Sequence, residues 1–186
     1  SNYYICEFPK SINLRKKGGM CLPAMTIRAY QASDWAAICR VHDSARLHEL
    51  AASSLSAAFL PLEVAAEREG LFEAEILVLE QDELVLGFVA VAGDELTWLY
   101  VDPGQFRRGL GRRLLRAAIG RANRPLSLEV LVGNDAALSL YLSEGFRIAG
   151  ISAGKLAGNE SHAAEAHVLR YEPEEGLAGP GGFSRA

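Results

Sequence analysis

Residues 95–116 read ELTWLYVDPGQFRRGLGRRLLR, and these residue types point to phosphate binding. Gly109 and Gly111 stand where a strand pattern gives way to a helical one, and their missing Cβ atoms would let a phosphate approach the backbone. The first turn of a helix offers unpaired N–H groups and the positive end of the helix dipole. A capping glycine explains Gly109 nearly as well. Two other phosphate motifs are excluded, because no Gly-Lys-Ser/Thr follows and Leu114 occupies the third glycine position of the dinucleotide fingerprint.

The charge around this turn favours the same interpretation. Residues 105–124 contain seven arginines and no acidic residue, so their charge is +7; the whole chain carries −4, which leaves −11 on the rest. Such a patch suits a phosphate-bearing partner, although a solvated helix face explains the charge alone equally well. Nucleic acid is disfavoured as a partner, because the rest of the chain is acidic and Phe106 is the one aromatic residue among these arginines.

A second segment, LEVLVGNDAALSLYLSEGF at residues 128–146, carries a candidate acid. Asn134, Ala137 and Tyr141 recur at helical spacing, and Gly145 ends the predicted helix before the next strand. Taken alone, Tyr141 fits a packing role better than a catalytic one.

The hydrophobic periodicity predicts the elements that must position these residues, in the order β α α β β β α β α β β. Tight connections at residues 81–83 and 93–94 imply an antiparallel meander of three strands. The predicted strands are 26–30, 75–80, 84–92, 95–101, 126–132, 146–151 and 165–171, and the predicted helices are 35–47, about 54–70, 109–120 and 134–144.

Length and composition predict one folded domain. The chain has 186 residues, of which 49% are hydrophobic, and this is enough to bury a core. We expect the domain to span residues 25–172. Residues 1–24 are expected to be an N-terminal extension, flexible or partly derived from a tag, and the Gly/Pro-rich residues 173–186 a flexible tail.

The apolar runs and the cysteines indicate in which cellular compartment the protein is expected. The richest apolar run, residues 84–91, stops after eight residues, so no membrane span is expected. The three cysteines fit neither a disulfide framework nor a metal-ligand pattern, which favours a reducing compartment and hence the cytoplasm. No metal is expected, because the histidines show no ligand spacing either. The cysteines are Cys6, Cys21 and Cys39, and the histidines are His42, His48, His162 and His167.

The two chemical segments together carry a resemblance to a known family. V-D-P-x-x-x-R-R-G-L-G-x-x-L-L, followed by L-E-V-x-x-x-N-x-x-A-x-x-L-Y-x-x-x-G-F, resembles motifs A and B of the GNAT superfamily of N-acetyltransferases. The resemblance covers residues 26–171, since the predicted element order also matches. It implies an α+β fold with three α/β layers: a mixed, mainly antiparallel seven-stranded sheet with splayed central strands, flanked by helices. One departure is Phe106, which stands where the family usually has Gln or Arg.

The resemblance implies that acetyl-CoA is a co-substrate and lies between the strands at 95–101 and 126–132. The pantetheine arm would pair with backbone groups of Leu99 and Val101, and Tyr141 would face the sulfur. The pyrophosphate would rest on the amides of residues 107–112. The full set of implied cofactor-binding residues is Leu99, Tyr100, Val101, Arg107, Arg108, Gly109, Leu110, Gly111, Arg112, Asn134, Ala137 and Tyr141.

An amine acceptor must lose a proton before it attacks. An alkyl ammonium with a pKa of about 10.4 is neutral in only about one molecule in a thousand near pH 7.4. Glu129 is the first candidate base, because it should face away from Leu128 and Val130 and resembles the glutamate of ribosomal-protein N-terminal acetyltransferases. Glu95 is the second, and alternation places it on one strand face with Leu99. A solvated carboxylate explains Glu129 equally well and Glu95 better.

Other groups would complete the reaction. Tyr141 would assist the departing thiolate by hydrogen bonding and late proton donation, because a phenol is a weaker acid than a thiol. A backbone N–H near Leu99 or Tyr100 would stabilise the oxyanion. His42 and His48 lie on the expected acceptor side, where surface histidines with satisfied hydrogen bonds are the default.

The expected activity is therefore transfer of an acetyl group from acetyl-CoA to a primary amine of a small molecule or of a protein or peptide N-terminus. The attack would be direct, within a ternary complex. The alternative is a non-catalytic module that binds or senses acyl-CoA. Residues 34–74 should build the acceptor pocket, the acceptor itself is left undefined, and a homodimer stays open as the oligomeric state.

Overall fold

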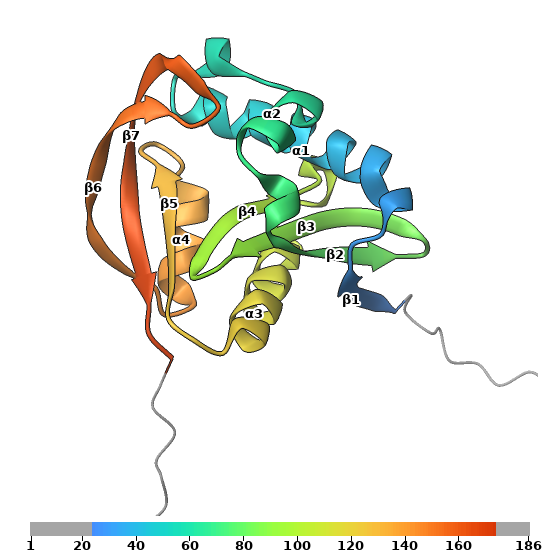
Figure 1. The fold of residues 1–186 in the computed structure, drawn as a ribbon. Coiled ribbons are helices and arrows are strands. Elements are labelled where there is room, and N and C mark those ends of the chain that lie inside the picture. The colour runs from blue at the N-terminus through green and yellow to red at the C-terminus, as the bar shows by residue number, and fades with distance from the viewer. Residues whose placement is uncertain (1–23, 174–186) are drawn as a thin grey trace, which may run out of the picture.

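The computed structural model describes residues 24–173, in which seven strands form one sheet with helices on both faces (Figure 1). The expected element order and α+β class are confirmed. The strands are β1 Met25–Ala29, β2 Glu75–Gln81, β3 Leu84–Ala92, β4 Glu95–Val101, β5 Leu126–Leu131, β6 Arg147–Leu156 and β7 Asn159–Tyr171. The helices are α1 Trp35–Ala52, α2 Leu62–Arg68, α3 Leu110–Ala122 and α4 Asp135–Ser143. The predicted extension up to residue 23, which includes Cys6 and Cys21, and the predicted tail from residue 174 lie outside the described residues.

The strand order is β1-β2-β3-β4-β5-β7-β6, and β4 and β5 are its one parallel pair within the described residues. The predicted meander of β2, β3 and β4 is confirmed. Its first turn holds Asp82 and Glu83 at positive φ, and this backbone conformation suits a two-residue hairpin loop.

Two apolar clusters fix the layers. On one face, α3 and α4 pack on the sheet through residues such as Leu114, Leu128 and Leu169. On the other face, α1 and α2 pack through Ile38 and Phe88 among others. Because β2 and β3 are covered on both faces, their sequences are nearly continuous apolar runs rather than alternating ones.

The helix expected over residues 54–70 is shorter than predicted. A turn of 3-10 helix at Ser56–Ala58 precedes α2, which starts only at Leu62. The reason is Pro61, which lacks an N–H group and restricts the residue before it, so a helix can begin after it but cannot run through it. The predicted end is confirmed, since Gly70 adopts the left-handed conformation with φ +66°.

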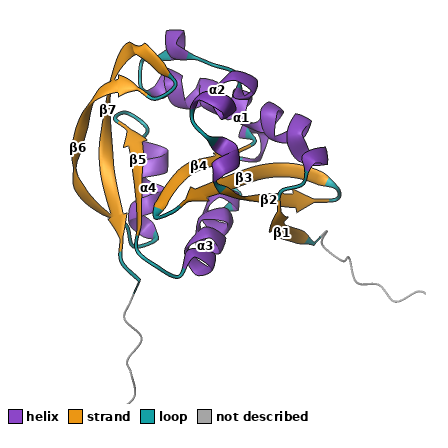
Figure 2. Cartoon of the chain, viewed as in Figure 1, coloured by secondary structure: helices purple, strands orange, loops and turns teal. Residues whose placement is uncertain are grey.

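Strands β6 and β7 are longer than the predicted segments 146–151 and 165–171. They form a hairpin that turns at residues 157–158. The added residues are mostly small or polar and lack the β-branched and aromatic side chains on which the strand prediction depended. The hairpin tip reaches α2 (Figure 2): Arg68 Nη1 donates to the Gly158 carbonyl at 2.9 Å, and Asn159 Nδ2 donates to the Ala58 carbonyl at 3.1 Å.

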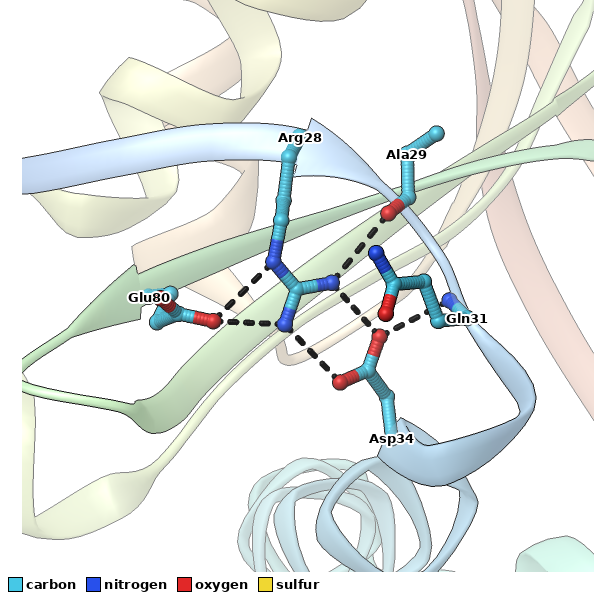
Figure 3. Close-up of polar contacts among 5 residues, drawn as sticks. All are labelled: Arg28, Ala29, Gln31, Asp34 and Glu80. Carbon is cyan, nitrogen blue, oxygen red and sulfur yellow. Dashed lines mark hydrogen bonds and ion pairs between the residues drawn. The ribbon is translucent and has the colours of Figure 1, made fainter.

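Arg28 of β1 joins the edge of the sheet to the start of α1 (Figure 3). Its guanidinium donates to both carboxylate oxygens of Asp34, at 2.7 and 2.9 Å, and to Glu80 of β2 from Nε at 3.0 Å and Nη2 at 2.5 Å. Asp34 is buried and also accepts a hydrogen bond from the Gln31 amide at 2.8 Å. One arginine therefore compensates two carboxylates.

We expect Arg28→Met to lower the free energy of unfolding by about 1–3 kcal/mol at pH 7, because it leaves the buried Asp34 carboxylate without its counter-ion. The Arg28 hydrogen bonds lower the pKa of Asp34, so this stabilisation is present above the unfolded pKa and is lost as the pH falls through the folded pKa. Urea unfolding at pH 7 and pH 3 measures both effects. The difference between wild type and variant should shrink in acid, while Arg170→Met, an exposed strand arginine, should stay within about 0.5 kcal/mol of wild type. A deficit that is equal at both pH values would contradict the assignment.

Candidate active site

Strands β4 and β5 diverge from a single point of contact. They pair only at Glu95 and Ser127, where the Ser127 amide donates to the Asp94 carbonyl at 2.8 Å. Beyond this point β4 follows β3 and β5 follows β7 (Figure 1). The edges of β4 and β5 that face each other therefore have backbone groups free to bind an extended ligand. The splayed central strands predicted above are confirmed.

A β-bulge redirects the side chains of β4. The pairing of β3 with β4 shifts between Ala90 and Val91, so Thr97 has no partner residue. Leu96 and Leu99 consequently pack in the same cluster on the α3 face, although they are three residues apart. Glu95 precedes the bulge and pairs with Ala92, so the expectation that it shares a face with Leu99 is wrong.

The start of α3 presents a row of free amides. Arg107 and Gly109 adopt left-handed conformations with φ +65° and +77°. Arg113 is the first residue whose amide donates back along the helix, to the Gly109 carbonyl at 3.1 Å. The amides of residues 107–112 have no backbone acceptor within residues 24–173. Successive amides in such a turn form an anion-binding nest at the positive end of the helix dipole.

Space in front of this turn is open. A Cβ atom added to Gly109 would meet no atom within 4 Å, so this glycine is needed for its backbone conformation. A Cβ on Gly111 would lie 3.3 Å from Leu140 Cδ2, which shows that α3 passes close to α4 at this point.

Several arginines of α3 already have protein partners. Arg112 and Arg116 both bind the half-buried Glu144, with Nε to oxygen distances of 2.8 and 2.6 Å. Arg121 pairs with Glu75. The basic patch is therefore less positive than the sequence count of +7 implies, and the side chain of Arg112 joins α3 to α4 while its amide remains free.

Tyr141 is buried on α4 and packs edge-to-face on Phe146, with ring centres 5.6 Å apart. Burial raises the pKa of its hydroxyl, and the negative charge of Glu49 raises it further, so the phenol is protonated at neutral pH. Asn134 starts the same helix, because its Oδ1 accepts from the Ala137 amide at 3.2 Å. Asn134 thus fixes the helix that carries Tyr141.

Glu129 lies exposed on β5, opposite Val168 of β7. Its neighbours Leu128 and Val130 are buried on the α3 face, as expected from alternation. Within the described part of the chain the exposed Glu129 side chain makes no ion pair.

A partly buried polar cluster on the α1 face was not predicted. Glu49 accepts from Arg46 Nη1 at 2.7 Å and from the Tyr100 hydroxyl at 3.0 Å. Glu69, at the end of α2, lies near this pair, and burial raises the pKa of its carboxyl from 4.5 to about 7. The cluster draws on three elements. Only the charged residues at positions 46 and 49, on a helix whose other side is apolar, could have indicated it from the sequence.

The prediction of surface histidines is wrong for His42. Its ring is buried, lies 4.9 Å from the Tyr100 ring and places Nδ1 2.8 Å from Asp43 Oδ1. Burial lowers its pKa, so the ring is neutral at pH 7. His48 is exposed, as expected.

A small cavity, called the α1 cavity below, opens within this cluster. Its volume is about 10 Å³, which is room for one water-sized group. The polar and aromatic residues that line it are His42, Arg46, Glu69, Trp98, Tyr100 and Asn159.

Between residues 24 and 173, the structure contains no cluster of three metal-binding side chains. No helix in this range is long and apolar enough to cross a membrane.

Comparisons with known proteins agree with this geometry. Residues 73–148 match the family model of the acetyltransferase (GNAT) domain. A segment of 58 residues, 31% of this chain, is 47% identical to N-alpha-acetyltransferase RimI of Mycobacterium tuberculosis and spans only 37% of that relative.

Solved structures share the fold. The ribosomal-protein-S18-alanine N-acetyltransferase of Escherichia coli has a TM-score of 0.62 and 26% identity, over 87% of this chain and all of that one. A GCN5-related N-acetyltransferase of Rhodopseudomonas palustris has a TM-score of 0.64 and 18% identity, over 83% and 99% of the two chains. YncA of Salmonella typhimurium, solved with its cofactor acetyl-CoA, has a TM-score of 0.59 and 22% identity, over 83% and 97%.

Proposed function

This chain belongs to the GNAT superfamily of acetyltransferases, and from that premise we propose that it transfers the acetyl group of acetyl-CoA to a primary amine. The observation that carries the proposal is the row of unpaired amides at residues 107–112, which lies at the start of α3 and follows the diverging strand β4. A pyrophosphate is the anion that such a turn binds well. The acetyl-CoA in the Salmonella neighbour supports the choice of ligand.

The residues present fit acetyl-CoA. Its phosphates would accept hydrogen bonds from the amides of residues 107–112, with Gly109 leaving the approach open. Its extended arm would pair with backbone groups of Leu99 and Val101, because among residues 24–173 this edge of β4 has no strand partner beyond Glu95. Asn134 keeps its side-chain NH₂ group free for the arm, since only Oδ1 is used in capping.

The reaction needs a base, an oxyanion donor and an acid. Glu129 is favoured over Glu95 as the base, because Glu95 lies where β4 and β5 still pair, whereas Glu129 lies beyond that point on the separating strand. A backbone N–H near Leu99 or Tyr100 would stabilise the oxyanion. Tyr141, protonated and buried, would donate to the departing thiolate.

Direct attack by the amine is favoured over an acyl-enzyme. Cys39 is the one cysteine among residues 24–173, and it is free. Burial raises the pKa of its thiol to about 11, so it is a poor nucleophile at neutral pH. A free, unreactive thiol also suits the reducing cytoplasm, which we propose as the compartment. That the protein forms a homodimer is still a prediction, which gel filtration would test.

The α-amine of a polypeptide is the first acceptor to test. Two relatives are named for N-alpha or ribosomal-protein-alanine acetylation, and the identity to one of them reaches 47% over 58 residues. An alanyl peptide and a panel of small alkyl amines should therefore be supplied with acetyl-CoA, and free thiol should be measured together with acetylated amine.

The small size of the α1 cavity favours a second candidate, a module that binds acyl-CoA without turning it over. The two functions differ in one result. An enzyme releases one thiol for each acetylated amine, whereas a binding module is saturated by acetyl-CoA and releases no thiol with any amine.

A further inference from the structure

Glu69 is a partly buried carboxylate without a counter-ion. It lines the α1 cavity, and within residues 24–173 its side chain makes no ion pair and accepts no hydrogen bond. Glu49, in contrast, is neutralised by Arg46 and accepts from Tyr100. The cluster therefore contains two carboxylates but only one guanidinium, which pairs with Glu49. The cluster carries a charge of −1 whenever Glu69 is ionised, and an unpaired charge that is partly removed from water is stabilised when it takes up a proton or a cation.

Two segments pack against this carboxylate. Glu69 is the C-cap of α2, and the left-handed Gly70 then turns the chain away. Gly158, at the tip of the β6–β7 hairpin, lies so close that an added Cβ would collide with the Glu69 carboxylate. The bonds from Arg68 to Gly158 and from Asn159 to Ala58 hold the tip in this position.

The charged groups around Glu69 come from two elements, α1 and β7. Arg46 of α1 lowers its pKa, and Glu49 of α1 and Glu160 of β7 raise it, but burial is the largest influence and brings the value to about 7. His42 and Tyr100 also line the cavity and are neutral at this pH. A cation of water size that can give up a proton is therefore the group that the cavity suits, and a primary ammonium meets both conditions.

We propose that Glu69 binds the ammonium group of the acceptor in the α1 cavity and accepts its proton in place of Glu129, an inference that rests on the proposed acetyl transfer. The ammonium gives one proton to the carboxylate and becomes a neutral amine. The nitrogen lone pair then forms a bond to the thioester carbonyl carbon, and the carbon–sulfur bond breaks. The thiolate takes a proton from Tyr141, which regains one from the acylated nitrogen. The proton on Glu69 passes to solvent, so one proton is released for each acetyl group transferred.

The test compares Glu69→Gln with wild type on an alanyl peptide at pH 7 and pH 9. The α-amine of such a peptide has a pKa of about 7.7–8.0, so it is mostly protonated at pH 7 and mostly neutral at pH 9. We expect kcat/KM of the variant to be about 10- to 100-fold lower at pH 7 and within about threefold of wild type at pH 9. The affinity for acetyl-CoA should not change. Glu67→Gln, on the exposed side of the same helix, is the matched control and should behave as wild type at both pH values.

Each other outcome overturns the inference. A deficit that is equal at both pH values indicates a structural role, and unchanged kinetics show that Glu69 does not contact the acceptor. If the wild-type protein releases no thiol with the peptide or with any amine of the panel, the proposed acetyl transfer is also wrong. This result therefore distinguishes a failure of the proposed function from a failure of the Glu69 proposal alone. If thermal melting shows that Glu69→Gln does not fold, Glu69→Asp replaces it, because aspartate keeps the charge. This variant should have the wild-type pH dependence of kcat/KM at a lower rate. A selective loss of activity near pH 7 in Glu69→Asp would overturn the inference.

Discussion

The Gly109→Glu protein should fold like wild type and bind acetyl-CoA at least about 100-fold more weakly, a loss of about 2.7 kcal/mol. Gly109 is exposed, and an added Cβ meets no atom, so the side chain itself causes no clash. Its carboxylate would, however, stand in front of the free amides of residues 107–112 and repel the pyrophosphate. A side chain also disfavours the left-handed conformation at φ +77° that shapes the turn.

Calorimetric titration with acetyl-CoA measures this effect, and Gly93→Glu is its matched control. Gly93 also has a positive φ, +58°, and open space around its missing Cβ, but it lies in the turn between β3 and β4. The control should keep wild-type affinity. If Gly109→Glu and wild type bound acetyl-CoA with equal affinity, the phosphates would not bind at the start of α3.

Tyr141→Phe should lower turnover about 10²- to 10³-fold and leave the affinity for acetyl-CoA nearly unchanged. The substitution keeps the packing of the ring on Phe146 and removes only the hydroxyl. That hydroxyl is protonated at neutral pH because burial raises its pKa, so it can donate to a thiolate. Steady-state rates with the best acceptor measure the effect.

Tyr171→Phe controls for the loss of a hydroxyl beside the same aromatic ring. Tyr171 also packs on Phe146, with ring centres 5.4 Å apart, and is given no role in the reaction. It should turn over at the wild-type rate. If Tyr141→Phe turned over as fast as this control, Tyr141 would have a packing role and no role as the acid.

Local features of the sequence predicted the element order and the backbone turn at the start of α3. Strands β3 and β4 have the predicted bounds, because their apolar runs end at short polar turns. The turn at Gly109 depends on residues adjacent in the chain, so spacing alone could indicate it.

Features that depend on distant segments were not predictable in the same way. The bulge at Thr97 arises from the pairing of β4 with β3, and no residue type in β4 marks it. The cluster of Arg46, Glu49, Glu69 and Tyr100 forms only when α1, α2 and β4 pack together. The partner of Arg112 and Arg116 is Glu144, the residue that follows α4, so the charge count overstated the free basic surface.

Amide hydrogen exchange tests the claim that acetyl-CoA binds along β4 and across the start of α3. The amides of residues 107–112 have no backbone acceptors among the described residues, so they should exchange fast in the free protein. Saturating acetyl-CoA should slow exchange across residues 99–112 more than elsewhere in the chain. Unchanged exchange in this segment, at a concentration where titration shows the protein to be saturated, would contradict the claim.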